Sequence, residues 1–201
     1  MNTYLDSLND AQKRAVLQKD GPMIIIAGAG SGKTRVLTYR IAHLMQQGID
    51  AFNILSLTFT NKAAKEMKAR IAGVVGNSES KNLWMGTFHS VFARILRSEA
   101  DKLGFPTNFT IYDSQDSVRL ISSIIKEMNL DKDRYKPKQV LGRISSFKNS
   151  LITVKAYRNN PEYLKQDTEA SRPKVGDIYK MYVERCFKSG AMDFDDLLLR
   201  T

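Results

Sequence analysis

The sequence predicts an α/β fold, in which a parallel β-sheet with helices on both faces is joined to a mostly helical inserted subdomain. Short apolar runs alternate with amphipathic helical patterns over the first half of the chain. A glycine-rich loop separates one of these runs from the helix that follows. After about residue 111 the strand-like runs stop and helical periodicity continues alone. We therefore assign residues 1–110 and 191–201 to the α/β domain and residues 111–190 to the helical subdomain.

The first strand and its flanking helices are expected before residue 48. Asn9 is a favourable N-cap residue, and a helix is predicted over residues 11–17. Residues 23–27 are apolar at every position, which predicts a parallel strand buried on both faces. A second helix is expected from Lys33 to about Gln47, ending at Gly48.

Two further strand–helix pairs follow. Residues 54–59 form the second strand candidate, and the next helix buries the apolar positions between Ala63 and Ile71. Residues 83–85 form the third strand candidate, followed by a helix whose apolar side chains recur over residues 88–96. This β-α-β-α-β-α order predicts a parallel sheet.

Helical periodicity alone marks the predicted subdomain. Apolar residues recur at helical spacing over residues 118–128 and 140–147, and residues 175–187 give a third helix. The change of pattern lies between Pro106 and Asp113.

Composition excludes several classes of protein. The chain has 201 residues and a single cysteine, Cys186, so it holds no internal disulfide, and a cytoplasmic location is expected. Its longest apolar run, residues 23–27, is far shorter than the roughly 20 residues of a membrane span. The first ten residues lack the apolar run of a secretory signal.

The charge indicates a polyanionic partner. The formal net charge is +10, and residues 132–158 hold eight basic residues against the single acid Asp133. Phosphate backbones attract such surfaces. The alternative is a solvated helical face. The basic residues of this stretch are Lys132, Arg134, Lys136, Lys138, Arg143, Lys148, Lys155 and Arg158.

Residues 27–34, Ala-Gly-Ala-Gly-Ser-Gly-Lys-Thr, match the Walker A pattern, with Ala27 in place of its first glycine, between a predicted strand and a predicted helix. Such a loop directs backbone N–H groups and a helix N-terminus at one point, where phosphate binds. Lys33 is predicted to reach the β- and γ-phosphates of ATP, and the Thr34 hydroxyl to ligate Mg²⁺. The predicted nucleotide-binding residues are Gln12, Ala27, Gly28, Ala29, Gly30, Ser31, Gly32, Lys33, Thr34 and Arg35.

Further segments resemble the UvrD/PcrA/Rep group of superfamily 1 DNA helicases. Residues 8–12, Leu-Asn-Asp-Ala-Gln, resemble the family's Q motif, in which the glutamine amide recognises adenine. Residues 58–67 are similar to motif Ia, and residues 86–90 resemble motif Ib. In the family both motifs contact single-stranded DNA. The resemblance therefore implies a DNA surface formed by Phe59, Thr60, Asn61, Lys62, Thr87, Phe88 and His89.

Taken alone, some of these residues have other interpretations. Phe59 can be a core residue and Asn61 a helix cap, while Phe88 lies on the apolar face of its predicted helix. Residues 192–198 resemble a segment that precedes the Walker B strand of the family. Because Lys188, Ser189 and Gly190 stand before this segment instead of an apolar run, we expect Asp195 and Asp196 to be structural or capping residues rather than Mg²⁺ ligands.

The resemblance runs along the whole chain. It implies a RecA-like P-loop NTPase domain, incomplete here and interrupted by subdomain 1B, from an ATP-dependent 3′–5′ helicase of DNA repair or replication. Its partners are then single-stranded DNA and junctions of single and double strands, with no membrane. The family's Walker B motif, arginine finger and second motor domain are not found, so we expect the chain alone to be inactive as a motor.

Three alternatives remain open at this stage. A nucleic-acid-binding module with a vestigial nucleotide site predicts DNA binding that is indifferent to nucleotide. A helicase–nuclease of the RecB or AddA type differs only in carboxyl-terminal parts. A P-loop kinase of small molecules leaves motifs Ia and Ib unexplained.

Overall fold

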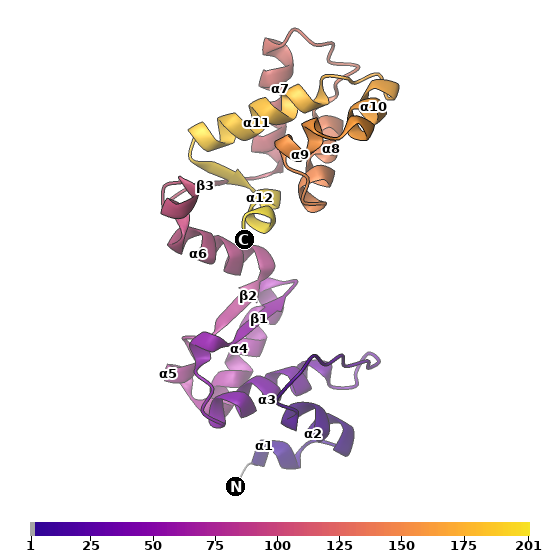
Figure 1. Cartoon of the computed structure of the whole chain (residues 1–201). Helices are drawn as coiled ribbons and strands as arrows, with labels where there is room; N and C mark the ends of the chain where they lie inside the picture. Colours follow the sequence, from indigo (N-terminus) through magenta and orange to yellow (C-terminus); the bar gives the residue numbers. More distant parts are fainter. Residues whose placement is uncertain (1–2) are drawn as a thin grey trace. The chain divides into compact units, whose positions relative to one another are not determined.

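The computed structural model describes residues 3–201, which divide into two compact units, the first ending at Val91 and the second beginning at Phe92. Figure 1 shows short strands among many helices in both. The first unit contains α1 (Thr3–Asp6), α2 (Asp10–Leu17), α3 (Lys33–Gln46), η1 (Ala51–Asn53), β1 (Leu55–Thr58), α4 (Asn61–Val75), α5 (Asn77–Ser80) and β2 (Trp84–Thr87). Helix α6 (Phe88–Ser98) begins in this unit and ends in the next.

The first unit contains a two-stranded parallel sheet. Strands β1 and β2 pair from Leu55 opposite Trp84 to Thr58 opposite Thr87, so both strands end at the same edge. Helices α3 and α4 supply the core beside the sheet, with Ile41 and Ile71 4% and 0% exposed. The predicted strands at 54–59 and 83–85 are therefore confirmed.

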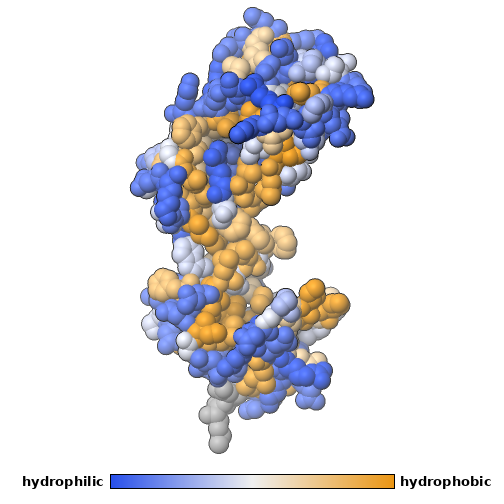
Figure 2. Space-filling model, in the orientation of Figure 1, coloured by the Kyte–Doolittle hydropathy of each residue, from blue (hydrophilic) through white to orange (hydrophobic). Residues whose placement is uncertain are grey.

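The predicted strand over residues 23–27 is wrong for the described chain. These residues form no regular element, and Ile24 and Ile26 are 88% and 94% exposed. A run that is apolar on both faces is stable as a strand only when neighbouring strands and covering helices bury it. In the described residues β1 pairs only with β2, so this run has no ladder to join. Figure 2 shows apolar surface, in orange, on this unit.

The second unit is mostly helical. It contains η2 (Ala100–Leu103), β3 (Thr110–Tyr112), α7 (Ser114–Glu127), α8 (Pro137–Asn149), α9 (Val154–Arg158), α10 (Pro161–Glu169), α11 (Val175–Lys188), β4 (Ala191–Asp193) and α12 (Phe194–Leu199). Its main core is formed by α7, α8, α9 and α11 and includes Ile121, Ile144, Tyr157 and Tyr179. The helices predicted over 118–128, 140–147 and 175–187 are confirmed as α7, α8 and α11.

Two short strands that the sequence did not predict join the ends of the helical segment. Strands β3 and β4 pair in parallel, with Thr110 opposite Ala191 and Tyr112 opposite Asp193. The chain therefore enters the helices at residue 113 and leaves them at residue 190 at neighbouring positions.

Candidate functional site

The glycine-rich loop leads directly into α3. Gly32 is the N-cap residue of this helix, with φ +85°, and Gly30 has φ +78°. Both values lie in the left-handed region, which L side chains rarely adopt. A Cβ at Gly32 would also lie 2.8 Å from the Nε2 atom of Gln12. Glycine at position 32 is thus required by its backbone angle, and a side chain there would also displace the Gln12 amide.

Gln12 joins α2 to the loop. Its Nε2 donates to the carbonyl oxygen of Ser31 at 2.9 Å, while its Oε1 accepts from the backbone N–H of Asn9 at 3.1 Å. The second bond completes a capping box, in which Asn9 accepts from the Gln12 N–H at 2.9 Å. An amide has two N–H donors and an oxygen with two lone pairs, so Gln12 keeps one donor and one acceptor for a further partner.

Lys33 and Ser31 both bind the loop backbone. The Lys33 ammonium donates to the carbonyl oxygens of Ala27 and Gly28 at 2.8 and 2.7 Å. The Ser31 hydroxyl donates to the same Gly28 oxygen at 2.7 Å. The positive charge of Lys33 is therefore held over the loop, at the amino end of α3.

A cavity of about 510 Å³ opens over the loop and the first turn of α3. Six consecutive loop and helix residues, 30–35, line it together with Gln12 and Arg70. Ala27, Gly28 and Ala29 belong to the loop and precede this lining. A second cavity of about 420 Å³, between α3 and α4, shares Arg35 and Arg70 with the first.

Arg70 was not predicted as a site residue. It lies on α4, next to the buried Ile71, and reaches the cavity from a helix that is distant in sequence from the loop. Nothing in the local pattern separates it from the other basic residues of α4, since only the packing of α4 against α3 brings it there.

The residues of motifs Ia and Ib gather where β1 and β2 end. Phe59 follows β1 and is 90% exposed, so it is not a core residue. Its ring centroid lies 6.0 Å from that of Phe88, which follows β2 and is 37% exposed. Thr60, not Asn61, is the N-cap of α4, and its hydroxyl accepts from the Ala63 N–H at 3.1 Å.

The remaining predicted residues lie in the first turns of α4 and α6. Asn61 and Lys62 are exposed at the start of α4. The Thr87 hydroxyl accepts from the Ser90 N–H at 3.3 Å, which fixes the start of α6, and His89 is half-buried in that turn. The edge thus presents two aromatic rings beside two helix N-termini.

Comparison with known proteins identifies the chain's relatives. A family model described as the UvrD/REP helicase N-terminal domain matches residues 8–201. The chain belongs to the UvrD/REP helicase family. It is 44% identical over 202 aligned residues to the ATP-dependent DNA helicase PcrA of Staphylococcus epidermidis and 42% identical to PcrA of Staphylococcus aureus. Each alignment covers 100% of this chain and 27% of the relative.

The acidic segment of this UvrD/REP-family chain has a structural role, as predicted. Asp193 is the N-cap of α12 and forms a capping box with Asp196. Lys148 is buried between them, with its Nζ 2.8 Å from Asp193 Oδ2 and 3.0 Å from Asp196 Oδ2. The Tyr182 hydroxyl donates to Asp193 Oδ2 at 2.8 Å. Asp195 accepts from the Asn149 amide at 3.2 Å.

Burial and charge act in opposite directions on these groups. Burial alone would lower the pKa of Lys148, but the carboxylates of Asp196 and Asp193 raise it above its usual value. Burial would raise the pKa of Asp193, and the Lys148 ammonium holds it below its usual range. Burial and the Asp193 carboxylate raise the pKa of Asp196 above its usual value, although Lys148 and Arg200 act to lower it. Because Arg200 Nε lies 3.4 Å from Asp196 Oδ1, the group in the second unit sets two cations against two carboxylates.

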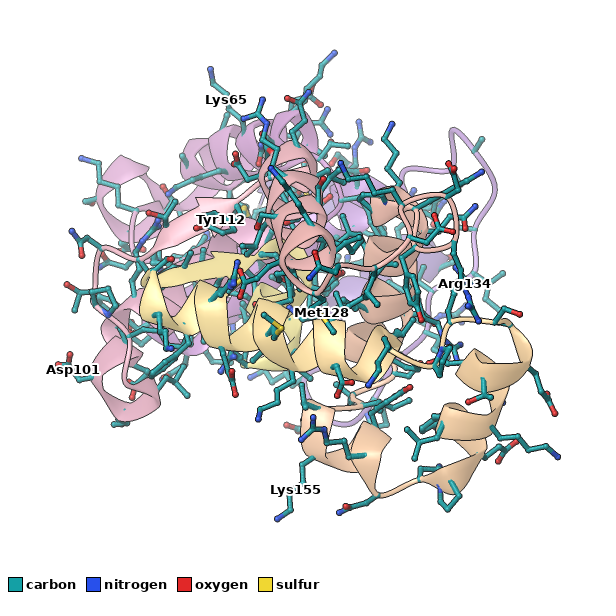
Figure 3. All side chains as sticks on the ribbon, turned by 90° about the horizontal axis from the view of Figure 1, so that it is seen from above. Lys65, Asp101, Tyr112, Met128, Arg134 and Lys155 are labelled. Carbon is teal, nitrogen blue, oxygen red and sulfur yellow. The ribbon has the colours of Figure 1, made fainter. Side chains whose placement is uncertain are left out.

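The basic stretch 132–158, from which the sequence predicts a polyanionic partner, is only partly available to one. Lys148 is buried in the cluster just described. Arg143 donates to Asp167 Oδ1 at 3.1 Å, and Arg158 to Asp177 Oδ1 at 3.3 Å. Four lysines of the stretch are exposed: Lys132, Lys136, Lys138 and Lys155. Figure 3 shows the Lys155 side chain pointing away from the ribbon.

The described residues contain neither a grouped set of metal-ligating side chains nor a membrane-spanning helix. Across residues 3–201, no three His, Cys, Asp or Glu side chains are grouped so as to hold a metal ion. No helix within the same residues is long and apolar enough to cross a membrane.

Proposed function

We propose that this chain is the ATP- and DNA-binding amino-terminal part of an ATP-dependent DNA helicase. The observation that carries the proposal is the cavity over the glycine-rich loop, lined by residues 30–35, Gln12 and Arg70. The names of the PcrA relatives support the same reading. The activity belongs to a longer protein, since this chain spans 27% of those relatives' length.

The loop fits the phosphates of a nucleotide. Gly30 and Gly32 hold the backbone in left-handed conformations at the start of α3, where N–H groups and the helix dipole favour an anion. The Lys33 ammonium already lies over the loop, so phosphate oxygens would exchange with the carbonyls of Ala27 and Gly28. Arg70 adds a second cation from α4.

We assign the remaining site residues to different parts of the nucleotide. We assign the adenine base to the free donor and acceptor of Gln12, and the flanking cation to Arg35. The hydroxyl of the exposed Thr34 would hold Mg²⁺. Bound Mg²⁺ would supply charge neutralisation on the phosphates.

Rapid hydrolysis is not expected of this chain. It requires a carboxylate that positions Mg²⁺ and the attacking water. In the second unit Asp193 and Asp196 both pair with Lys148, Asp196 also pairs with Arg200, and together they form the capping box of α12. We therefore propose that the chain binds nucleotide without significant turnover.

Single-stranded DNA is assigned to the edge where β1 and β2 end. Phe59 and Phe88 offer exposed rings on which bases stack, and the N-termini of α4 and α6 offer backbone donors to phosphates. We propose 3′–5′ movement of the intact protein and binding at junctions of single and double strands, with the exposed Lys132, Lys136 and Lys155 on the duplex.

The domain division is part of the proposal. We assign residues 1–110 and 191–201 to a RecA-like domain 1A and residues 111–190 to the inserted subdomain 1B. The parallel pairing of β3 with β4 supports an insertion, because it brings the two ends of the helical segment side by side.

Two binding measurements on the 201-residue chain test this function. A fluorescent ADP analogue with Mg²⁺ reports the loop, and a labelled oligothymidine of about 15 nucleotides reports the strand edge. Lys33→Ala should weaken nucleotide binding at least about tenfold and leave DNA binding unchanged. Phe59→Ala should weaken DNA binding about 5- to 150-fold, the effect of one lost stacking contact, and leave nucleotide binding unchanged.

Lys165→Ala, an exposed position in α10, is the control for both ligands. Nucleotide binding that survives Lys33→Ala would remove the loop from the proposal. DNA binding that survives Phe59→Ala would remove the strand edge.

A further inference from the structure

A groove outside the site already described runs between α7 and α8 of the second unit. It encloses about 610 Å³, within the range of pockets that bind ligands. Its floor is formed by the half-buried Val118 of α7 and Leu141 of α8, with Gly142 beside them. Its rim carries the exposed cations Arg119 and Lys138, one from each helix. The groove thus combines an apolar floor with a positive rim.

Gly142 is not explained by the packing of the chain itself. It lies in the middle of α8, where glycine weakens a helix relative to alanine. Its φ is not positive, and a Cβ built there meets nothing within 4 Å. Gly176 of α11 is different, because a Cβ there would lie 2.2 Å from the Tyr157 ring. The missing side chain at Gly142 leaves open space in the groove floor, where another backbone can approach closely.

The rim cations are exposed and are not closely paired with carboxylates of the second unit, so they can attract a charged partner. The Arg119 side chain is 75% exposed, and its nearest carboxylate, Asp116, is 3.9 Å away. Lys138 is exposed and belongs to the basic stretch of a chain whose net charge is +10. Carboxylates flanking an apolar stripe would complement this rim.

We propose that the α7–α8 groove docks an acidic amphipathic helix of a partner protein. Aliphatic side chains of that helix, at positions i, i+3 or i+4 and i+7, fill the floor over Val118, Leu141 and Gly142. Glutamate or aspartate side chains on its edges pair with Arg119 and Lys138. The inference does not depend on the nucleotide or DNA site proposed above.

Nucleic acid fits this groove less well. Proteins that hold single strands combine positive charge with aromatic rings on which bases stack. The residues that line the groove include no aromatic side chain, and their floor is aliphatic. The exposed rings of the chain's predicted DNA surface, Phe59 and Phe88, belong to the other unit.

The test uses the 201-residue chain and a designed probe. The probe is a fluorescein-labelled helical peptide of about 14 residues, with leucine at the i, i+3, i+4 and i+7 positions and glutamate elsewhere. Binding is followed by fluorescence anisotropy and mapped by amide chemical shifts. A second peptide with lysine in place of every glutamate measures the part of the affinity that depends on acidic charge.

Two variants locate the probe. Gly142→Leu fills the floor at a position with open space and higher helix propensity, so the variant should fold at least as well and bind the probe at least about tenfold more weakly. Lys138→Glu should weaken binding more than Lys165→Glu, which makes the same change of charge on α10, outside the groove. Thermal unfolding by circular dichroism verifies that each variant is folded.

The proposal predicts shifts confined to α7 and α8, tighter binding of the acidic peptide than of the basic one, and loss of binding in Gly142→Leu. Unchanged affinity in Gly142→Leu would overturn it. Competition by a 15-nucleotide oligothymidine at these residues would show a nucleic-acid surface instead. Self-association of the chain that disappears in Gly142→Leu would show a second copy as the occupant, which also contradicts the proposal.

Discussion

Replacing Lys148 by methionine tests whether the buried charge cluster stabilises the second unit. The Lys148 side chain is 1% exposed, and its partners Asp193 and Asp196 are 6% and 3% exposed. Methionine removes the ammonium, leaving Asp193 buried without its cation and Asp196 with only Arg200, whose Nε lies 3.4 Å from Asp196 Oδ1. Breaking a buried ion pair in this way costs about 3–5 kcal/mol. For a second unit of 110 residues that unfolds in its own transition, that corresponds to a fall of about 13–22 °C in Tm.

The measurement is thermal unfolding of the 201-residue chain, followed by two probes. Circular dichroism at 222 nm follows the helices, most of which lie in the second unit. Trp84, the chain's single tryptophan, reports the first unit. We expect the transition of the second unit to move and that of Trp84 to remain in place.

Lys165→Met is the matched control. Lys165 forms an exposed pair with Glu169 at 3.8 Å, and such pairs contribute about 0.3–0.5 kcal/mol. If Lys148→Met costs no more than this control, the cluster does not hold the second unit together, and the reasoning from burial and charge is refuted.

Three further predictions concern the second unit. Gly176→Ala should destabilise it by about 1–3 kcal/mol, because a Cβ there would lie 2.2 Å from the Tyr157 ring. Gly142→Ala should stabilise it by about 0.5–1 kcal/mol, because alanine favours a helix and has open space there. Equal effects of the two variants in urea unfolding would contradict both expectations. Leu151 has φ +58°, so Leu151→Gly should stabilise the unit by about 0.5–1 kcal/mol, and a loss of Tm would count against this. The loss of unfolding free energy caused by Lys148→Met should be smaller at pH 4 than at pH 7. Without the ammonium, burial raises the folded-state pKa of both carboxyls above the unfolded value, so the destabilisation disappears as they are protonated. A loss that stays constant in pH-dependent unfolding would show that the carboxyls are not responsible.

The elements with strong periodicity were predictable from the sequence. Asn9 caps α2 as expected, and the predicted helices at 33–47 and 175–187 agree with α3 and α11 within one residue at each end. Strands β1 and β2 were found because their apolar runs are bounded by helices. In these places local pattern and tertiary packing agree.

The errors occur where packing overrides local pattern. Residues 23–27 have the composition of a buried strand, but a strand is stabilised by neighbours that pattern alone does not supply. Strands β3 and β4 are three residues long, too short for periodicity to detect, and exist because the two ends of the helical segment meet.

For the candidate site, motif reasoning named the loop, Gln12 and Arg35, but not Arg70. Arg70 reaches the cavity only through the packing of α4 on α3. Lys148 counted toward a basic surface in the sequence, yet the fold buries it between two aspartates. Charge counted along a sequence therefore overestimates the charge that a surface presents.

The most direct test of the central claim is ATP hydrolysis, with and without single-stranded DNA. It compares this chain with a protein extended to the full length of the PcrA relatives. The account predicts that the full-length protein is strongly stimulated by DNA and silenced by Lys33→Ala, while the 201-residue chain is silent. Rapid turnover by the chain alone would mean that Asp195 or Asp196 acts in hydrolysis, and would contradict the structural role assigned here to the acidic segment.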